Sequence, residues 1–307
     1  MKAAVYTKYG GPEVLQVTDV PKPDPKANEV LIEVQSTTVT SGDVRLRASD
    51  FPPLFWLPAR LIFGLFKPKK SILGHEFSGV VTAVGKQVTK FKEGDHVFGT
   101  TTMKPSGSYA EFVCLPQEWK QGVLEHAPKG LSHDVIASLP IGGMTALFLL
   151  EKGEFAQGKS VLVYGASGSV GSYAVQIAQA LGASTITGVC SAANAEMVKT
   201  LGADQVIDYK TSDYTDTTDK FDIVFDAVGK TSKTAGKKVL KSNGKYVSVN
   251  MLTAEKSESL LQLKELAENG KIKPFIDRTY SLDEIAEAHR YVDSGRKRGS
   301  VVIRVKN

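Results

Sequence analysis

Residues 161–171, VLVYGASGSVG, are the most informative stretch of the chain. An apolar run is followed by a glycine-rich turn and by a helical pattern that ends near Gly182. In the phosphate-binding pattern Gly-x-Gly-x-x-Gly, Ala166 takes the first position, and Gly168 and Gly171 take the second and third. The second glycine lets the backbone approach a pyrophosphate, and the third lets the helix pack against the strand. Strand, turn and helix together predict a dinucleotide site, and a glycine-rich turn of another α/β fold is the alternative.

Strands and helices alternate after this turn. Further strands are predicted at residues 185–190, 205–207, 221–228 and 245–249. Helices are predicted between them at residues 194–201 and 232–240, with another at 257–268. Alternation of this kind predicts an α/β fold with a doubly wound parallel sheet.

The two ends of the chain have a different texture. Short β-branched runs between turn signals predict strands before residue 125, for example at residues 30–34 and 79–84. The last predicted strand, residues 300–305, could pair with this N-terminal region. We therefore predict a β domain made of residues 1–125 and 271–307, and a nucleotide-binding domain of residues 126–270.

Composition excludes several classes of protein. At 42% apolar and 23% charged residues the chain is typical of a globular protein, and about 150 residues per domain gives two domains for 307 residues. The excess of 38 Lys and Arg over 33 Asp and Glu is small and scattered, so no nucleic-acid partner is expected. No signal peptide and no apolar window of about 20 residues is evident, so we expect a cytoplasmic protein without an integral membrane segment.

Cysteine usage agrees with a reducing compartment. The two cysteines, Cys114 and Cys190, cannot supply a disulfide framework or a four-cysteine zinc site. We expect both thiols to be buried.

The end of the second predicted strand bears on the choice of cofactor. An NAD site usually has an Asp or Glu there, about 20 residues after the glycine turn. No charged residue lies between Ser172 and Asn194, so the 2′-phosphate of NADPH would meet no carboxylate, and Ser191 is a candidate donor to it. Because Lys199 and Lys210 come only later in the chain, NADH remains possible.

Two further motifs join the glycine turn in a resemblance to a known family. Residues 74–81, GHEFSGVV, and residues 91–97, FKEGDHV, resemble the medium-chain dehydrogenase/reductase superfamily. Residues 139–146, LPIGGMTA, and residues 201–209, LGADQVIDY, fit as well, and the similarity covers nearly the whole chain. The chain looks most like the zinc-independent quinone oxidoreductase branch, which implies a GroES-like β domain and a Rossmann domain.

The resemblance also implies which residues bind the cofactor. They are Thr145, Gly165, Ala166, Ser167, Gly168, Ser169, Val170, Gly171, Ser191, Tyr209, Val228, Gly229 and Asn250. The glycine turn and Thr145 would contact the diphosphate, and Ser191 and Tyr209 would lie near the adenosine 2′ position. Val228 and Gly229 would lie near the nicotinamide ribose, with Asn250 beside the nicotinamide.

A zinc site is not expected. Zinc-dependent relatives use a Cys in the segment that matches residues 39–43, the His of Gly-His-Glu, and a later Cys or Asp. Here the first position is Thr40, and only His75 and Glu76 remain, which is too few ligands for tetrahedral zinc. We expect His75 to be a hydrogen-bonded histidine.

The catalytic candidates are Thr40, Asp43 and Arg45, which lie in the segment matching the active-site strand of the family. Relatives commonly have Asn at the position of Thr40 and often Tyr at that of Arg45. A turn-capping role for Asp43 is the alternative to a role in the site, and water is an alternative source of the substrate proton.

The resemblance implies an NADPH-dependent oxidoreductase that needs no zinc and reduces quinones or activated carbon–carbon double bonds by hydride transfer. An enoyl-thioester or 2-alkenal reductase, or a non-catalytic NADPH-binding protein, is the alternative. Residues 51–58, FPPLFWLP, are predicted as an apolar loop that forms a lid or a membrane-facing patch, or packs on its own domain.

One departure from the family concerns architecture. The fifth predicted strand ends at Asn250, and a helix follows almost directly, so the sixth strand of the family is missing. We therefore predict a five-stranded sheet and loss or alteration of the family's edge-strand dimer.

Overall fold

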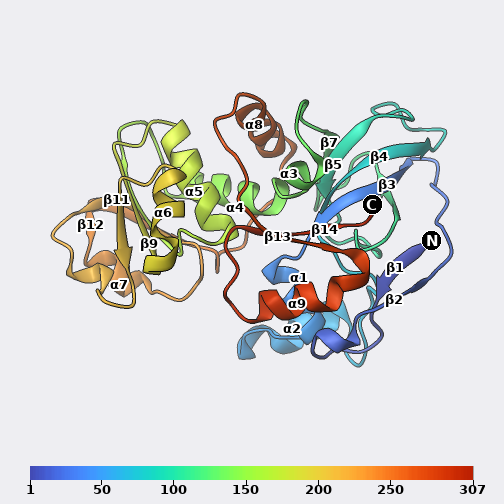
Figure 1. The fold of residues 1–307 in the computed structure, drawn as a ribbon, viewed down its shortest axis with the longest axis horizontal. Helices are drawn as coiled ribbons and strands as arrows, with labels where there is room; N and C mark the ends of the chain where they lie inside the picture. The colour runs from blue at the N-terminus through green and yellow to red at the C-terminus, as the bar shows by residue number, and fades with distance from the viewer. Residues whose placement is uncertain (307) are drawn as a thin grey trace. The chain divides into compact units, whose positions relative to one another are not determined.

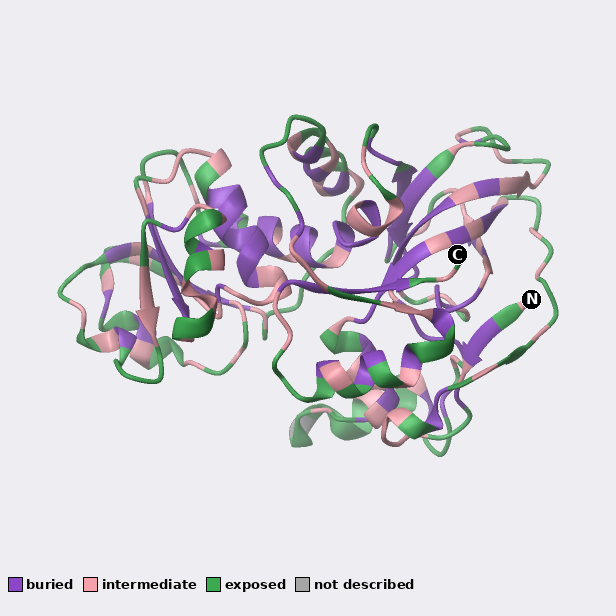
Figure 2. Cartoon of the chain, viewed as in Figure 1, coloured by how far each residue is buried: buried purple, intermediate pink, exposed green. Residues whose placement is uncertain are grey.

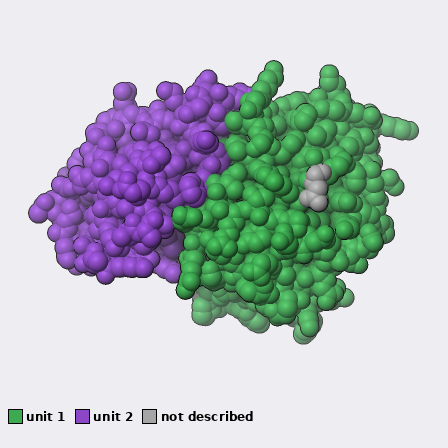
Figure 3. Space-filling view, viewed as in Figure 1, with its two compact units in different colours: residues 1–140, 276–307 green, residues 141–275 purple. Residues whose placement is uncertain are grey.

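The computed structural model describes residues 1–306, so residue 307 of the predicted C-terminal segment lies outside the described residues. The chain has two compact units (Figure 3). Unit 1 contains residues 1–140 and the segment from residue 276 onward, and unit 2 contains residues 141–275. Residues 126–140, predicted as part of the nucleotide-binding domain, lie in unit 1, where helix α3 (His133–Ala137) packs on the sheet.

Unit 2 contains a parallel sheet with the strand order β10-β9-β8-β11-β12 (Figure 1). Its strands are β8 (Ser160–Tyr164), β9 (Thr185–Cys190), β10 (Gln205–Asp208), β11 (Phe221–Asp226) and β12 (Leu240–Ser248). The chain enters at the central strand β8, adds β9 and β10 on one side, and then adds β11 and β12 on the other. This order confirms the predicted doubly wound sheet of five strands. In such sheets ligands bind beyond the carboxyl ends of the strands, where the order reverses.

Helices precede, connect and follow these strands, and only a 3-10 turn lies between β10 and β11. They are α4 (Pro140–Lys152), α5 (Ser169–Ala180), α6 (Ala195–Thr200), α7 (Lys233–Lys237) and α8 (Ser257–Glu268), with short 3-10 turns η2 (Ala192–Asn194) and η3 (Tyr214–Asp216). Helix α5 ends where Gly182 adopts φ +82°, a conformation that glycine favours just after a helix. Helix α7 is shorter than predicted because residues 240–244 already belong to strand β12.

Unit 1 is built around a sheet of order β13-β14-β3-β4-β5-β7, with β6 paired to β3. Its strands are β3 (Glu29–Thr38), β4 (Glu76–Val84), β5 (His96–Thr100), β6 (Phe112–Pro116), β7 (Leu124–His126), β13 (Ile276–Ser281) and β14 (Ser300–Arg304), and β1 (Lys2–Val5) pairs with β2 (Gln16–Asp19). Strand β14 runs antiparallel to β3, with Val302 opposite Thr38. The predicted pairing of the last strand with the N-terminal region is confirmed.

The prediction of a loop at residues 51–58 is wrong. Helix α2 (Pro53–Phe63) begins there, and α1 (Ser41–Ala48) precedes it. Proline at the first helical position costs no hydrogen bond, because the first amides of a helix have no internal partner. Pro52 and Pro53 therefore mark the start of a helix, with Pro52 at the N-cap, whereas Pro58 lies inside it. Figure 2 shows that much of α2 is exposed, whereas strands β8, β9 and β11 of the unit 2 sheet are largely buried.

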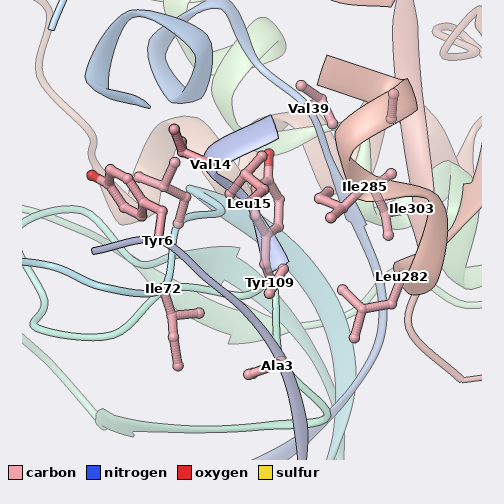
Figure 4. Packing of buried hydrophobic residues seen from close by; sticks show 14 of the residues in the cluster. Ala3, Tyr6, Val14, Leu15, Val39, Ile72, Tyr109, Leu282, Ile285 and Ile303 are labelled. Atoms are coloured by element: carbon pink, nitrogen blue, oxygen red, sulfur yellow. The ribbon is translucent and has the colours of Figure 1, made fainter. Parts of the chain in front are cut away.

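The core of unit 1 joins residues from both ends of the chain (Figure 4). Ala3 and Tyr109 pack there with Ile285 of helix α9 (Ile285–Asp293) and Ile303. The remaining unit 1 elements are the 3-10 turns η1 (Pro12–Val14) and η4 (Leu282–Glu284).

A buried polar pair that the sequence did not reveal lies beside this core. The Arg47 guanidinium contacts His289 Nδ1 at 3.1 Å and donates to Asp293 at 2.8 Å. His289 is itself buried, and its Nε2 lies 3.2 Å from the Tyr109 hydroxyl.

Two further expectations concern membranes and thiols. No helix within residues 1–306 is long and apolar enough to cross a bilayer. Both cysteines are free, and Cys190 is buried as expected. Cys114 is only half-buried, because its strand β6 alternates buried and partly exposed positions. Burial raises the pKa of each thiol to about 11.

Candidate functional site

The glycine turn between β8 and α5 is shaped by two glycines that admit no side chain. Gly165 has φ +81°, and a Cβ there would lie 2.0 Å from Val228 Cγ2. A Cβ on Gly171 would lie 2.1 Å from the Gly165 carbonyl oxygen, so the close packing predicted for the third glycine is present. Both distances are far below van der Waals contact, which makes glycine a structural requirement at these two positions.

Gly168 differs from its neighbours in this turn. A Cβ there would meet only the Gly165 carbonyl oxygen, at an ordinary contact distance of 3.5 Å. The chain itself therefore leaves room that a diphosphate could use. Gly168 is also the N-cap of α5 and supplies no side-chain cap, so the helix amides and the positive end of the helix dipole suit an anion. The turn fits the diphosphate of a dinucleotide.

Helix α4 contacts the same turn. A Cβ on Gly142 would lie 2.7 Å from Ser169 Oγ and 2.9 Å from the Tyr173 ring. Thr145 follows one helical turn later, on the same side of α4 as Gly142.

Ser191 and Tyr209 lie side by side at the ends of β9 and β10. Cys190 and Asp208 are paired in register, and the Tyr209 amide donates to the Cys190 carbonyl at 3.2 Å. Asn194 Nδ2 also donates to Ser167 Oγ at 3.1 Å, which ties the glycine turn to the chain after β9.

The charges near this strand end come from β10, the loop that follows it, and the segments around α7. The Asp208 carboxylate accepts the Lys210 amide at 3.0 Å. A hollow of about 510 Å³ opens next to Tyr209, and its walls include Tyr164, Lys210, Tyr214, Lys230 and Lys238. Three lysines thus line the hollow next to Tyr209, together with the Asp213 carboxylate, and Asp208 is a second carboxylate nearby that sequence reasoning did not consider there.

A buried carboxylate organises the loop after β11. Asp226 Oδ1 accepts the amides of Val228 at 3.1 Å and Gly229 at 2.8 Å. Asp226 Oδ2 accepts the hydroxyls of Tyr246 at 3.0 Å and Ser248 at 3.1 Å. This turn ends β11 at Asp226, two residues before the predicted end.

Asn250 joins the same cluster. Its Nδ2 donates to the Gly229 carbonyl at 3.3 Å, and its amide donates to Ser248 Oγ at the same distance. The structure thus places Val228, Gly229 and Asn250 together. Sequence reasoning missed Asp226, although a carboxylate closing an apolar strand just before Ala-Val-Gly was a usable signal.

The catalytic candidates of unit 1 lie where α1 begins. Thr40 is the N-cap of α1: its Oγ1 accepts the Asp43 amide at 3.1 Å, and Asp43 Oδ2 accepts the Thr40 amide at 3.0 Å. Asp43 Oδ1 accepts the Gly74 amide at 2.9 Å and lies 2.7 Å from His75 Nδ1. Asp43 thus caps the helix and also holds His75. The Arg45 side chain is exposed and is not part of this group.

Asp43 is fully buried and stays ionised. Burial alone would raise its pKa, but hydrogen bonds to His75 and Thr40 and the nearby His289 hold the pKa of this carboxyl well below its usual range. A carboxylate only accepts, so His75 Nδ1 carries the shared proton. Asp43 is therefore suited to position His75 rather than to donate a proton at neutral pH.

His75 lines a pocket of about 280 Å³ within unit 1. Its other walls are mostly apolar, with lysines near its edge: Tyr6, Leu46, Ile62, Phe63, Lys69, Lys70, Leu73, Met103, Lys104 and Pro105. The pocket suits a small apolar molecule that has a polar group near an imidazole.

Comparison with known proteins identifies the family. Residues 26–128 match the alcohol dehydrogenase GroES-like domain, and residues 169–291 match the zinc-binding dehydrogenase family. The chain is 35% identical to 2-methylene-furan-3-one reductase of Solanum lycopersicum, and 32% identical to the chloroplastic NADPH-dependent alkenal/one oxidoreductase of Arabidopsis thaliana. Each alignment covers 99% of this chain and 79% of the relative. The quinone oxidoreductase structure from Coxiella burnetii superimposes with a TM-score of 0.85 at 28% identity, over 100% of this chain and 99% of the other.

The chain belongs to the medium-chain dehydrogenase/reductase superfamily. Within that class, these relatives place it in the quinone-oxidoreductase-like branch.

One matched family is described as zinc-binding, and a zinc site would need a group of His, Cys, Asp or Glu side chains. Within residues 1–306, no three side chains of His, Cys, Asp or Glu are grouped so as to hold a metal ion. His75 Nδ1 bonds Asp43, and Glu76 accepts the Thr38 hydroxyl. The donor set does not fit a tetrahedral zinc centre.

Proposed function

We propose that this chain is an NADPH-dependent reductase that transfers a hydride to a quinone or to a carbon–carbon double bond activated by a carbonyl group. The glycine turn carries the proposal, since Gly165 and Gly171 are fixed by packing while Gly168 leaves space at a helix N-terminus. The relatives, among them an NADPH-dependent alkenal/one oxidoreductase and a 2-methylene-furan-3-one reductase, support the reaction class.

The residues of unit 2 would bind and orient the cofactor, which supplies the hydride when it is bound. The amides of α5 would hold the diphosphate. The Asp226 carboxylate fixes the turn at Val228 and Gly229, and Asn250 donates a hydrogen bond to the Gly229 carbonyl. This loop would therefore orient the nicotinamide ribose. Thr145 would contact the diphosphate from α4.

We propose a preference for NADPH over NADH because of the residues at the end of strand β9. Ser191 offers a hydroxyl there, and Tyr209 lies beside it. Lys210 can partly neutralise a 2′-phosphate, while Asp208 keeps one of its oxygens on the Lys210 amide. We expect binding of NADH to be weaker but measurable.

The substrate is proposed to enter the pocket beside His75. The Asp43 carboxylate fixes Nδ1, which leaves Nε2 as the ring atom that can bond a substrate oxygen. Thr40 and Asp43 would act by positioning His75, and Arg45 remains a candidate without a partner in this group. We propose that no zinc takes part, because His75 and Glu76 are both engaged elsewhere.

The cytoplasm remains the proposed compartment. Two free thiols with a raised pKa agree with a reducing environment, since neither is poised for disulfide exchange. Cell fractionation with the full-length chain tests this point.

The test of the function is a substrate panel. A 1,4-quinone, an enone, a 2-alkenal and an enoyl thioester are each mixed with the protein and with NADPH or NADH, and loss of the reduced cofactor is followed. We expect substrate-dependent oxidation that is faster with NADPH, unchanged by a chelator, with no stoichiometric zinc by elemental analysis. Cofactor binding without turnover of any substrate would instead indicate a non-catalytic NADPH-binding protein, and a preference for the enoyl thioester would favour that reductase class.

A further inference from the structure

Helix α2 and the loop that follows it present large apolar side chains to solvent. Phe66 is 89% exposed, Phe55 62%, Leu61 58% and Ile62 53%. Single exposed apolar residues are common on proteins, but a contiguous group of this kind marks an interaction surface. We call residues 55–70 the α2 surface.

The α2 surface is held in place from its other side. Ala59, Arg60 and Phe63 are the less exposed residues of the helix, and the spacing of 59 and 63 puts them on one face. The Phe63 ring stacks on Phe51 with centroids 6.0 Å apart, and the Tyr9 hydroxyl donates to the Gly64 carbonyl at 2.8 Å. Leu57 and Leu61 lie on the opposite side of the helix and are exposed, whereas Phe55 and Ile62 lie at the border of the anchored face.

The charge of the α2 surface has a single sign. Between Asp50 and Glu76 the sequence contains no Asp or Glu, but it contains Arg60, Lys67, Lys69 and Lys70. Arg60 is bound within the surface, where its Nε donates to the Leu65 carbonyl at 2.9 Å and its guanidinium lies over the Tyr9 ring. Lys69 Nζ donates to the Leu61 carbonyl at 2.8 Å, which places an ammonium next to the apolar side chains.

We propose that the α2 surface docks the protein on an anionic lipid bilayer. Apolar side chains that enter the boundary between headgroups and acyl chains, with lysines at headgroup level, are what an interfacial helix needs. Helix α2 has 11 residues, about half of the ~20 needed to span a bilayer, so it would lie in the interface.

A second copy of the chain is a poorer occupant. A symmetric dimer places the same surface of both copies in contact, so Lys67 and Lys69 of one copy would face the lysines of the other. Like charges brought together in this way oppose association. Anionic lipid headgroups offer the opposite charge.

The pocket beside His75 gives a functional reason for docking on a membrane. Ile62, Phe63 and Lys69 belong to the α2 surface and also line that pocket. A docked protein would thus open the pocket close to the lipid phase, where apolar quinones and enones partition. This last point rests on the proposed function, whereas membrane docking does not.

The first test is flotation of the full-length chain with vesicles of phosphatidylcholine alone or with phosphatidylglycerol. We expect binding only to the anionic vesicles, and loss of binding at high salt. Lys67→Gln and Lys69→Gln should each lower the partition coefficient about fivefold, and Phe66→Ser should also lower it. The matched controls are Lys233→Gln and Leu252→Ser, at exposed positions of unit 2, which should bind like the wild type.

A second test reads the insertion directly. The chain has two tryptophans, so Trp119→Phe leaves Trp56 of the α2 surface as the sole reporter. Its fluorescence should shift to shorter wavelength with anionic vesicles, and lipids brominated on the acyl chain should quench it.

Three results would overturn the proposal. They are no binding to anionic vesicles, equal binding of the surface variants and the controls, or a concentration-dependent dimer that Phe66→Ser abolishes. Because vesicle binding needs neither cofactor nor substrate, an inactive protein that still binds vesicles would refute the proposed function alone.

Discussion

We expect the Ser191 side chain, at the end of strand β9, to influence the choice between NADPH and NADH. It follows the last paired residue of β9 and lies beside Tyr209, where a carboxylate would select NADH. The neighbouring Asp208 carboxylate is bonded to the Lys210 amide.

Ser191→Asp should therefore change cofactor preference. The new carboxylate would repel the 2′-phosphate, so the KM for NADPH should rise about tenfold, equivalent to about 1.4 kcal/mol. The KM for NADH should stay nearly unchanged. Initial rates with both cofactors measure this, and Ser191→Asn is the uncharged control. An equal rise for both cofactors would remove Ser191 from the 2′ position.

The buried His289 side chain should make the free energy of unfolding depend on pH. Burial lowers the pKa of His289 to about 3 in the folded chain, and Arg47 adds to this effect. Since the unfolded histidine has a pKa near 6.5, the unfolded chain binds one more proton between pH 3 and 6.5. The free energy of unfolding should be highest above pH 6.5 and fall as the pH drops below it, by at most ~1.4 kcal/mol per pH unit from this residue.

His289→Gln should remove that contribution. Chemical unfolding between pH 7.5 and 5, with the wild type measured in parallel, gives the slope of stability against pH, and the variant should have the shallower slope. Identical slopes would mean that His289 does not enter the folded state as a neutral side chain.

The sequence could predict the structural role of some single residues but not of others. Gly171 could be predicted because a recurring backbone path there excludes a side chain. Arg47 and His289 meet across 242 positions of the chain. No local pattern encodes such a contact, so these residues were missed.

Among the elements, the glycine turn contains one glycine that packing requires and another that leaves space for a ligand. Gly171 packs against the Gly165 carbonyl oxygen, whereas Gly168 has room for a methyl group. The two positions therefore form a matched pair within one segment.

Gly171→Ala should lower the free energy of unfolding by about 1–3 kcal/mol, because the methyl group overlaps backbone atoms. Gly168→Ala should leave the Tm close to that of the wild type and weaken NADPH binding at least tenfold, since its methyl group would occupy diphosphate space. Thermal unfolding and NADPH titration distinguish the two. A Gly168→Ala variant that binds NADPH normally would place the diphosphate elsewhere.

Helix α2 shows where element prediction failed. Its prolines and aromatic residues have the composition of a loop, but Pro53 is in the first turn, and contacts from Phe51, Tyr9 and Arg60 hold the helix. The contact with Tyr9 crosses 55 positions of the chain, so the local sequence could not indicate it. Strands β8 and β9 of unit 2 were predicted to the residue, because buried parallel strands appear as continuous apolar runs. Strand β12 begins five residues before its predicted start, in a mostly exposed polar stretch that has no such run.

In the whole molecule, the five-stranded sheet leaves β12 as an edge strand with one neighbour. That strand carries Lys241 and Lys245, which pair with Asp222 and Glu154 of the same unit. Lysines on an edge strand oppose pairing with another sheet. We keep the prediction that the edge-strand dimer of the family is lost or altered.

Light scattering after gel filtration tests this prediction with the full-length chain. We expect the mass of one chain across a wide concentration range. A stable dimer that Lys241→Val strengthens would show that β12 pairs between subunits after all.

The position of β14 in its sheet has a consequence for how the chain is made. Strand β3 has β14 as its neighbour on one side, yet 261 positions separate the last residue of β3 from the first residue of β14 in the chain, and all of unit 2 lies between them. During synthesis on the ribosome, unit 2 is complete before β14 emerges. β6 can already pair with residues 29–33 of the nascent β3, but residues 36–38 keep an open edge until β14 is made. An open strand edge is a site for unwanted pairing, so we expect this short stretch to need protection in the newborn chain.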